Sequence, residues 1–247
     1  MAYIASHLAI AGTVAAVLLF LLAALPLVYL QPPPAGFLES IFLTALFGAM
    51  SAAFALVPGL AAAMAARGRW GPLSQVFYIP AVVPPTSVGV LLLASFQVPR
   101  AACIGGIEWT CGIAAFVSEH VVNRPLGILI AMWVMALPVT FSIYDGALRE
   151  ERAEVFFRSL GYSGTRLVWV MMRSLRSTTT SAFIFAWIRS FGELGVLLVF
   201  ASYPPTAAIY IYNAWLTYGV GPAVGASLAV ATVAYMTAYL ARRWLSR

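Results

Sequence analysis

The chain has 247 residues, of which 62% are hydrophobic and only 9% are charged. Soluble domains carry about 25% charged residues, so this composition excludes a soluble protein and indicates an integral membrane protein. The net charge of +6 lies at the ends of apolar segments and not on a soluble basic face, which excludes nucleic acid as a partner.

Six apolar segments are long enough to cross a bilayer, since a helical span needs about 20 apolar residues. We expect these spans at residues 8–30, 37–66, 73–96, 126–148, 178–202 and 221–240. The first has neither a basic residue before it nor a small-residue cleavage site after it, so we expect a retained span and not a signal peptide. The spans leave no room for a soluble catalytic or nucleotide-binding domain, and they predict one all-α membrane domain over residues 1–247.

The third of these segments contains three prolines, Pro80, Pro84 and Pro85. Each proline removes a backbone N–H donor and frees a carbonyl that neighbouring helices or water must satisfy. A helix broken in this way typically lines a cavity. We therefore expect Pro84, Pro85 and Thr86 beside a pathway through the membrane.

The loop at residues 98–123 contains Cys103 and Cys111, the only two cysteines of the chain. Their spacing around a Gly-Gly turn suits a small hairpin closed by a disulfide on an oxidising side of the membrane, worth about 2–3 kcal/mol. Two independent thiols are the alternative. The pattern disfavours a metal site, because it has no CxxC pair and His120 is a lone candidate ligand.

The segment at residues 149–176 concentrates charge in a chain that is otherwise apolar. It predicts a short helix, a left-handed elbow at Gly161 and a second helix. Three apolar side chains of the first helix stand among arginines and glutamates: Phe156, Phe157 and Leu160. Such a surface indicates a docking site for another protein. The alternative is an amphipathic helix that lies in the lipid headgroups with its arginines on the polar side.

The fifth segment places Arg189 and Glu193 one helical turn apart, with Gly192 between them and Gly195 after them. An isolated charge in mid-membrane costs several kcal/mol, so we expect the two side chains to neutralise each other in part while facing the bundle interior or an aqueous path. The alternative is a pair that packs helices, with glycines that permit close approach. Under the pathway interpretation these four residues form a gate for an anion. Glu193 would weaken the binding of the anion to Arg189, which by itself would bind it too tightly for release.

The distribution of arginine sets the expected orientation, because the chain contains no lysine. One set of span ends carries most of the arginines, at residues 67–69, 149–176 and 242–247. The other set carries only Arg100 and Arg124. Cytoplasmic loops have the excess of positive charge, so we expect the first set, and with it both termini, in the cytoplasm.

The loop around Glu154 resembles the cytoplasmic EAA loop of binding-protein-dependent ABC importer permeases. Glu154 precedes the sequence SLG at residues 159–161, and a basic, apolar run follows it into the next span. Phe156 and Phe157 stand where the family usually has alanines, and the leucine and proline that usually close the motif are replaced. The resemblance implies a role in ATPase coupling for five residues: Glu154, Phe156, Phe157, Leu160 and Gly161.

Other segments resemble the permeases of molybdate, tungstate and sulfate importers. The sequence RSFGELG at residues 189–195 is similar to their signature ARAxGEFGA, and residues 82–93 and 135–148 resemble their third and fourth spans. Residues 201–230 resemble the archaeal type of molybdate/tungstate permease, which has a similar YYP, then IY, then a GL or GV turn before the last span. The resemblance covers most of residues 37–240 and favours molybdate or tungstate as substrate, with sulfate or thiosulfate as the alternative.

The resemblance implies a homodimer of six-helix subunits with the type I ABC importer fold and a pathway on the two-fold axis, where Gly192 and Gly195 would let the two subunits approach. An external oxyanion-binding protein would deliver the anion, and two cytoplasmic ATPase subunits would bind ATP and Mg²⁺. The chain has no GxxxxGK[ST] phosphate loop, which agrees with a transporter subunit that is not an enzyme and carries no cofactor of its own. We therefore expect a multi-pass protein of the cell membrane that works by alternating access.

Two other classes of membrane protein fit the sequence less well. A channel needs a selectivity ring and no energy-coupling dock. An intramembrane enzyme needs catalytic side chains that face each other within the spans, where Arg189 and Glu193 are the candidates. Neither class explains why the densest charge of the chain lies at residues 149–176.

Overall fold

The computed structural model describes residues 12–13, 16, 31–67, 71, 75–150 and 153–245. Within these ranges the protein consists of helices and connecting turns without strands, and four of its helices are long and apolar enough to cross a membrane. The predicted all-α class and the predicted multi-pass membrane protein are therefore confirmed. The predicted span at residues 8–30 lies almost entirely outside the described residues.

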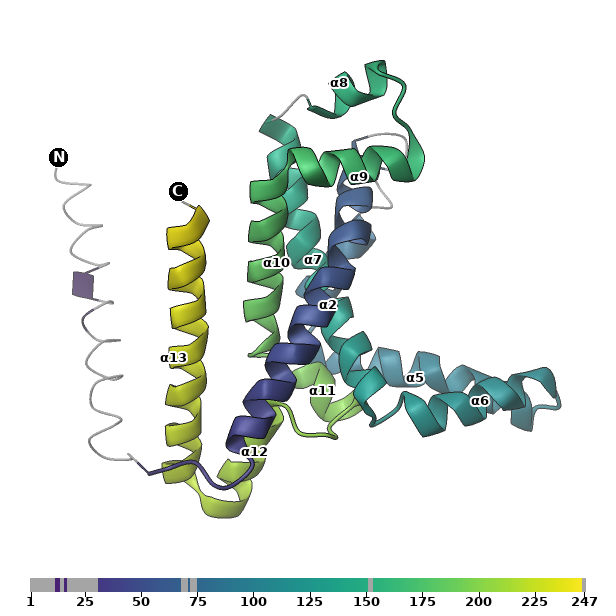
Figure 1. Ribbon diagram of the computed structural model, residues 1–247. Helices are drawn as coiled ribbons and strands as arrows, with labels where there is room; N and C mark the ends of the chain where they lie inside the picture. The colour runs from purple at the N-terminus through teal and green to yellow at the C-terminus, as the bar shows by residue number, and fades with distance from the viewer. Residues whose placement is uncertain are drawn as a thin grey trace.

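Three helices form the centre of the fold: α2 (Phe37–Ala66), α7 (Pro125–Glu150) and α10 (Arg176–Ser190). They pack side by side in Figure 1. The residues buried where they meet are small: Ala52, Ala55, Ala136 and Ala186. Small side chains let helix backbones approach closely, which is the main source of packing energy between membrane helices. This approach brings Thr140 Oγ1 of α7 within 3.1 Å of the Ala55 carbonyl of α2, to which it donates a hydrogen bond.

Two short helices, α8 (Ala153–Ser159) and α9 (Gly164–Ser174), lie across one end of this bundle between α7 and α10 (Figure 1). The chain turns between them at Gly161, whose φ of +85° is in the left-handed region that favours glycine. The predicted helix, elbow and second helix are confirmed. We call this part of the molecule the α8–α9 end.

The last two helices, α12 (Ala207–Tyr218) and α13 (Val220–Leu245), form a hairpin on the other side of α10. α13 ends near the α8–α9 end, as Figure 1 shows. The start of α12 is held to α2, because the Ala207 N–H donates a hydrogen bond of 2.7 Å to Thr44 Oγ1. α13 corresponds to the last predicted span.

The third predicted span is broken at its prolines. A 3-10 helix, η1 (Gln75–Tyr78), leads into the single turn of α4 (Ile79–Val82), and α5 (Pro85–Ile104) begins after a gap of two residues. In this gap Val83 is extended, with ψ of 139°. A residue that precedes a proline avoids the helical region for steric reasons, so Pro84 ends α4. The predicted break is confirmed.

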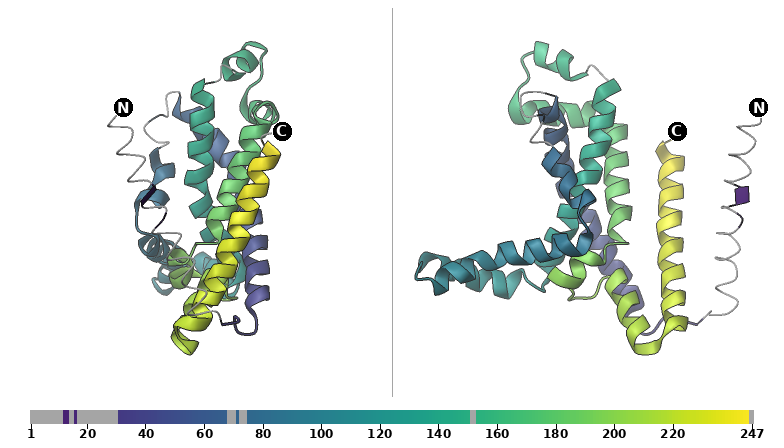
Figure 2. Two further views of the ribbon diagram at one scale, coloured as in Figure 1. Left: turned by 90° about the vertical axis from the view of Figure 1, so that its left-hand side faces the viewer. Right: turned by 180° about the vertical axis from the view of Figure 1, so that it is seen from behind.

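The predicted loop at residues 98–123 is wrong, because most of it is helical. α5 continues through Pro99 to Ile104, turns at a Gly-Gly pair and returns as α6 (Trp109–His120). Ala101 and Ala102, which have the highest helix propensity, favour the continued helix. The α5–α6 hairpin extends sideways from the bundle, as the views in Figures 1 and 2 agree.

The fifth predicted span is also broken, which corrects the expectation of one helix over residues 178–202. α10 ends at Ser190, residues 191–194 are not helical, and α11 (Gly195–Phe200) follows. α11 is buried in the core beside α7, where Val196, Leu197 and Phe200 pack against Ile128 and Met132. The part of the fifth segment after its break therefore reaches the interior of the fold.

Candidate functional site

The two broken segments meet through very close backbone contacts between α11 and α5. A Cβ atom added to Gly195 would lie 2.7 Å from Pro85 Cβ and 3.1 Å from the Thr86 nitrogen. A Cβ at Gly89 would lie 3.0 Å from the Val196 carbonyl oxygen. Only hydrogen fits at these two positions, so the glycines allow α11 to lie directly on the first turns of α5.

The two glycines of the predicted gate differ in their surroundings. The close contact of Gly195 lies within its own chain, and a Cβ at Gly192 would find its nearest atom, the Arg189 carbonyl oxygen, at 3.9 Å. The break before α11 turns Gly195 toward α5, so this glycine supports a contact between two helices of one chain. The expectation that both glycines let two subunits approach stays a prediction.

Arg189 lies just before this break and Glu193 lies within it. Arg189 is in the last turn of α10, and Glu193 stands two residues before α11. The distance from Arg189 Nη1 to Glu193 Oε2 is 2.8 Å, which confirms the ion pair predicted from their spacing. The contact is one between charges and not an aligned hydrogen bond, and Oε2 has no hydrogen-bond donor among the described residues.

The carboxylate of Glu193 also organises the backbone around it. Its Oε1 accepts a hydrogen bond of 3.3 Å from the Val196 N–H in the first turn of α11. Free N–H groups and the positive end of the helix dipole favour a carboxylate there. The glutamate therefore stabilises the start of α11, which explains why the fifth segment is interrupted and does not continue as one helix.

Arg189 lines a cavity of about 260 Å³ between α4, α7, α10 and the start of α5. Pro80, Pro85 and Pro138 form part of its wall, and Tyr78 and Ser142 add polar groups. Pro84 and Thr86 flank Pro85 in the chain. Since a water molecule occupies about 30 Å³ in the liquid, the cavity has room for several waters or a small anion beside the guanidinium.

At the α8–α9 end the predicted docking residues divide between two faces of α8. Phe156 and Leu160 are each 59% exposed, and Val155 beside them is exposed as well. Phe157 is half-buried and packs edge-on against Tyr162, with the two ring centroids 6.0 Å apart. The exposed apolar face of α8 is thus Val155 and Phe156, together with Leu160 directly after the helix.

Glu154 lies on the inner face of α8 and is buried. Its Oε1 accepts a hydrogen bond of 2.9 Å from Arg158 Nε, and Arg158 Nη2 lies 2.8 Å from the same oxygen. The glutamate therefore shapes the helix from within, while Gly161 forms the elbow after it. The structure brings these residues together at the α8–α9 end. Arg189 lies at the opposite end of α10.

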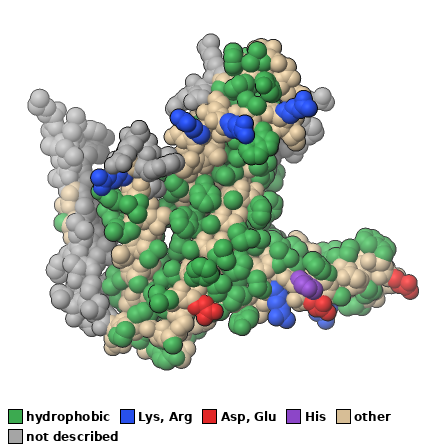
Figure 3. Space-filling view, in the orientation of Figure 1, with side chains coloured by type: hydrophobic (Ala, Val, Ile, Leu, Met, Phe, Trp, Pro, Cys, Tyr) green, Lys and Arg blue, Asp and Glu red, His purple; other side chains and the backbone are tan. Residues whose placement is uncertain are grey.

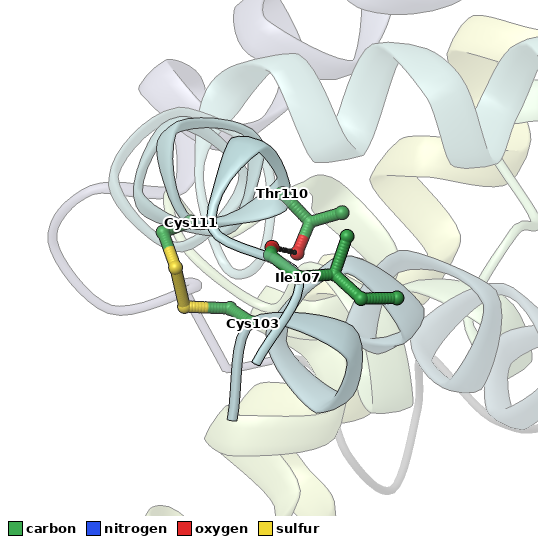
Figure 4. The surroundings of a disulfide bond; sticks show 4 residues. All are labelled: Cys103, Ile107, Thr110 and Cys111. Atoms are coloured by element: carbon green, nitrogen blue, oxygen red, sulfur yellow. Dashed lines mark hydrogen bonds between the residues drawn. A yellow bond between two sulfur atoms is a disulfide. The ribbon is translucent and has the colours of Figure 1, made fainter. Parts of the chain in front are cut away.

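The tip of the α5–α6 hairpin contains a disulfide between Cys103 and Cys111, which confirms the predicted bridge (Figure 4). The two Cα atoms lie 4.9 Å apart. Inside the turn Thr110 Oγ1 donates a hydrogen bond of 2.7 Å to the Ile107 carbonyl. The cross-link joins the end of α5 to the beginning of α6, so it stabilises a helical hairpin and not an irregular loop.

Asn123 was missed by the sequence analysis. It follows α6 in a left-handed conformation, with φ of +57°, and its N–H donates a hydrogen bond of 3.1 Å to the Phe200 carbonyl. Its Oδ1 accepts hydrogen bonds from the Ser202 N–H and Oγ, both at 2.9 Å, and from the Tyr203 N–H at 3.1 Å. The Asn-Arg-Pro sequence before α7 was a turn signal that could have pointed to it, because asparagine tolerates this conformation.

The comparisons with known proteins identify the class of transporter. No protein-family model matches the chain. It is 27% identical to the molybdate/tungstate transport system permease protein of Pyrococcus furiosus, over 67% of this chain and 59% of that protein. The corresponding protein of Methanocaldococcus jannaschii is 27% identical over 85% of this chain and 86% of its own length.

The matched part of the chain spans only about half the length of the Thermococcus kodakarensis relative, 50% at 28% identity. The match to a Salmonella typhimurium permease protein named for 2-aminoethylphosphonate transport is more extensive, with 30% identity over 92% of this chain and 89% of that protein. Given this identity over nearly the full length of both chains, the protein belongs to the family of ABC transport permease proteins that includes the molybdate/tungstate permeases.

Proposed function

We propose that the chain is the permease subunit of an importer that moves an oxyanion, molybdate or tungstate, into the cytoplasm. The observation that carries this proposal is Arg189, a charged group that lines a cavity between two broken helices of a membrane protein. An anion that crosses an apolar bundle needs such a group. The names of the relatives support molybdate or tungstate as the substrate.

Two other kinds of anion are candidates for the same pathway. Sulfate or thiosulfate fits the resemblance of residues 189–195 to the oxyanion signature. A phosphonate is favoured by the relative that is 30% identical and is named for 2-aminoethylphosphonate. All of these substrates present negatively charged oxygens to an arginine, so the cavity by itself accommodates each of them.

In the proposed gate Arg189 contacts the anion and Glu193 limits how tightly it binds. A bare guanidinium in a low-dielectric site would hold an anion too strongly for release, whereas conduction needs a site that is attractive but weak. The buried carboxylate at 2.8 Å competes for the same guanidinium and keeps it in one position. The close contact of Gly195 with Pro85 would make α5 and α11 move together when the gate opens.

The remaining steps of transport involve partners. Two copies of the chain would form a homodimer, an external binding protein would deliver the anion, and two ATPase subunits would dock at the α8–α9 end. The exposed apolar face of α8 supports this docking, since a helix that only connects two spans gains nothing from exposed phenylalanine. Closure of the ATPases on ATP and Mg²⁺ would move α8 and α9 and so switch the pathway between its two sides.

The proposed orientation places the α8–α9 end in the cytoplasm. This end carries Arg158, Arg166, Arg173 and Arg176, and the excess of positive charge belongs on that side of a membrane. The disulfide hairpin, which extends sideways from a part of the bundle away from the α8–α9 end, is then kept apart from the reducing cytoplasm. Both termini would lie on the cytoplasmic side.

The function is tested by reconstituting the permease with its ATPase and its binding protein in vesicles. We expect ATP-dependent uptake of labelled molybdate or tungstate, with weaker uptake of sulfate and of 2-aminoethylphosphonate. Preferential uptake of one of the latter two would reassign the substrate. An intact complex that hydrolyses ATP but takes up none of these anions would contradict the proposal.

A further inference from the structure

A second and larger cavity lies under the α8–α9 end and takes no part in the proposed pathway. Its volume is about 750 Å³, within the range of about 300–1,000 Å³ that is typical of small-molecule sites. Val57, Ala61 and Ala65 of α2 form one wall, and Trp169 and Met172 of α9 form another. The walls are apolar, and the candidate gate residues do not contribute to them.

The rim of this cavity is basic. Arg158 of α8 lines it directly. Arg166, Trp169 and Arg173 share one face of α9, because residues three and four positions apart are neighbours on a helix. Trp169 is 64% exposed, and the Arg173 guanidinium carbon lies 5.7 Å from the centre of its ring. Figure 3 shows basic side chains over α8 and α9 above the apolar surface of α2.

An apolar cavity with an arginine and tryptophan rim, at the end of a membrane-spanning helix, matches the chemistry of an anionic phospholipid. Tryptophan is enriched at the level of the lipid headgroups, and basic pockets between membrane helices bind anionic headgroups. We propose that this cavity binds one anionic phospholipid, with an acyl chain between α2 and α9 and the headgroup phosphate at Arg158 and Arg166.

The proposed lipid also touches the helix that we assign to ATPase docking. Arg158 holds Glu154 through two contacts of 2.8 and 2.9 Å, so a phosphate at Arg158 would share the guanidinium with the inner face of α8. The lipid would therefore set the position of α8. This consequence rests on the proposed function, whereas binding of the lipid does not.

The site is tested by native mass spectrometry of the full-length protein in detergent, titrated with phosphatidylglycerol or with phosphatidylcholine of the same acyl chains. We expect phosphatidylglycerol to remain bound at lower concentration. Arg166→Gln, an exposed substitution that leaves the fold intact, should weaken phosphatidylglycerol roughly fivefold and phosphatidylcholine little. Ala61→Phe should weaken both adducts, because the ring would occupy part of the apolar wall on which the acyl chain would lie.

Two matched variants control for charge and size. Arg100→Gln removes an exposed arginine of α5, and Leu46→Phe enlarges an exposed residue of α2 outside the cavity; both should bind lipid as the unmodified protein does. Equal affinity for the two lipids, or unchanged binding in Ala61→Phe, would overturn the proposal. So would a change in oligomeric state in Ala61→Phe without loss of lipid, since the cavity would then be an interface between copies. Because no transport is measured, a failed uptake assay leaves the result intact.

Discussion

Glu193 and Arg189 form an ion pair whose two members are buried to very different extents: the glutamate side chain is 1% exposed and the arginine side chain 39%. A carboxylate that is fully buried needs a paired charge. The arginine, by contrast, keeps part of its surface toward the cavity and can exchange one partner for another. This exposure toward the cavity favours a role for Arg189 in the pathway over a role in helix packing alone.

Glu193→Gln removes the negative charge but keeps Oε1 as an acceptor for the Val196 N–H. We expect vesicle uptake to fall tenfold or more, about 1.4 kcal/mol, because the charge that competes for the guanidinium is gone and Arg189 would then hold the anion too tightly. The ATPase subunits should remain bound. Glu119→Gln on α6 serves as a control for an exposed glutamate.

The alternative interpretation gives a different result in the same variant. If the pair only packs helices, thermal stability and the yield of assembled complex should fall in step with uptake. Normal uptake by normally assembled Glu193→Gln protein would remove this residue from the gate.

Gly195→Ala should be far more harmful than Gly192→Ala. The new Cβ at position 195 would lie 2.7 Å from Pro85 Cβ, and such overpacking costs about 1–3 kcal/mol. At position 192 the nearest atom would be 3.9 Å away. Melting temperature and uptake should both fall for Gly195→Ala, and Gly195→Leu should be worse. Equal effects of the two alanine substitutions would show that the α5–α11 contact is not critical.

Local chemistry made part of this site predictable. The sequence shows directly the residue types that cause the break at Pro84 and the elbow at Gly161. It also shows the spacing of one helical turn that pairs Arg189 with Glu193. The side of α8 that faces inward was predictable in principle as well. Glu154 and Phe157 are three residues apart and therefore share a face.

The rest depends on contacts between distant segments. Gly195 meets Pro85 across more than a hundred residues, and the carboxylate of Glu193 stabilises the start of α11 after the break. Nothing in the sequence of the fifth segment distinguishes this break from a continuous helix with small residues. The link between Asn123 and Ser202 is of the same kind, because both residues lie in turns that only the fold brings together.

Phe156→Asp should release the ATPase subunits while the permease stays folded, since Phe156 is 59% exposed. Phe157→Asp should instead lower the melting temperature, because this ring packs on the cluster around Leu167 and Met171. Phe116→Asp on α6, at a similar exposure, is the control and should retain the ATPase. Co-purification and thermal unfolding measure the two effects. If Phe156→Asp retained the ATPase at unchanged stoichiometry, α8 would not be the docking helix.

The disulfide should be present in protein isolated without reductant. Mass spectrometry of the unreduced chain should find Cys103 joined to Cys111, with no thiol available for alkylation. Replacing both residues with serine should destabilise the α5–α6 hairpin by about 2–3 kcal/mol, the loop-closure effect for a short loop. Faster amide exchange confined to α6 and the hairpin turn would show this. Two thiols that alkylate without reductant would reject the bridge.

Asn123 should hold the segment that follows α11. Asn123→Gly keeps a residue that adopts positive φ but removes the acceptor of three hydrogen bonds, whereas Asn123→Asp keeps both. Because the site is exposed, we expect a cost of about 1 kcal/mol for the glycine variant.

Hydrogen exchange of the Ser202 and Tyr203 amides measures this directly. In Asn123→Gly the exchange should be faster, since both amides lose the Oδ1 acceptor, and in Asn123→Asp it should match the unmodified protein. Uptake should be lower in Asn123→Gly than in Asn123→Asp. The carbonyl of Phe200, at the end of α11, accepts a hydrogen bond from the Asn123 N–H, so the turn helps to position α11 beside the proposed gate. Unchanged exchange in the glycine variant would mean that the turn is held by other contacts. Faster exchange with normal uptake would mean that the end of α11 can loosen without disturbing the gate.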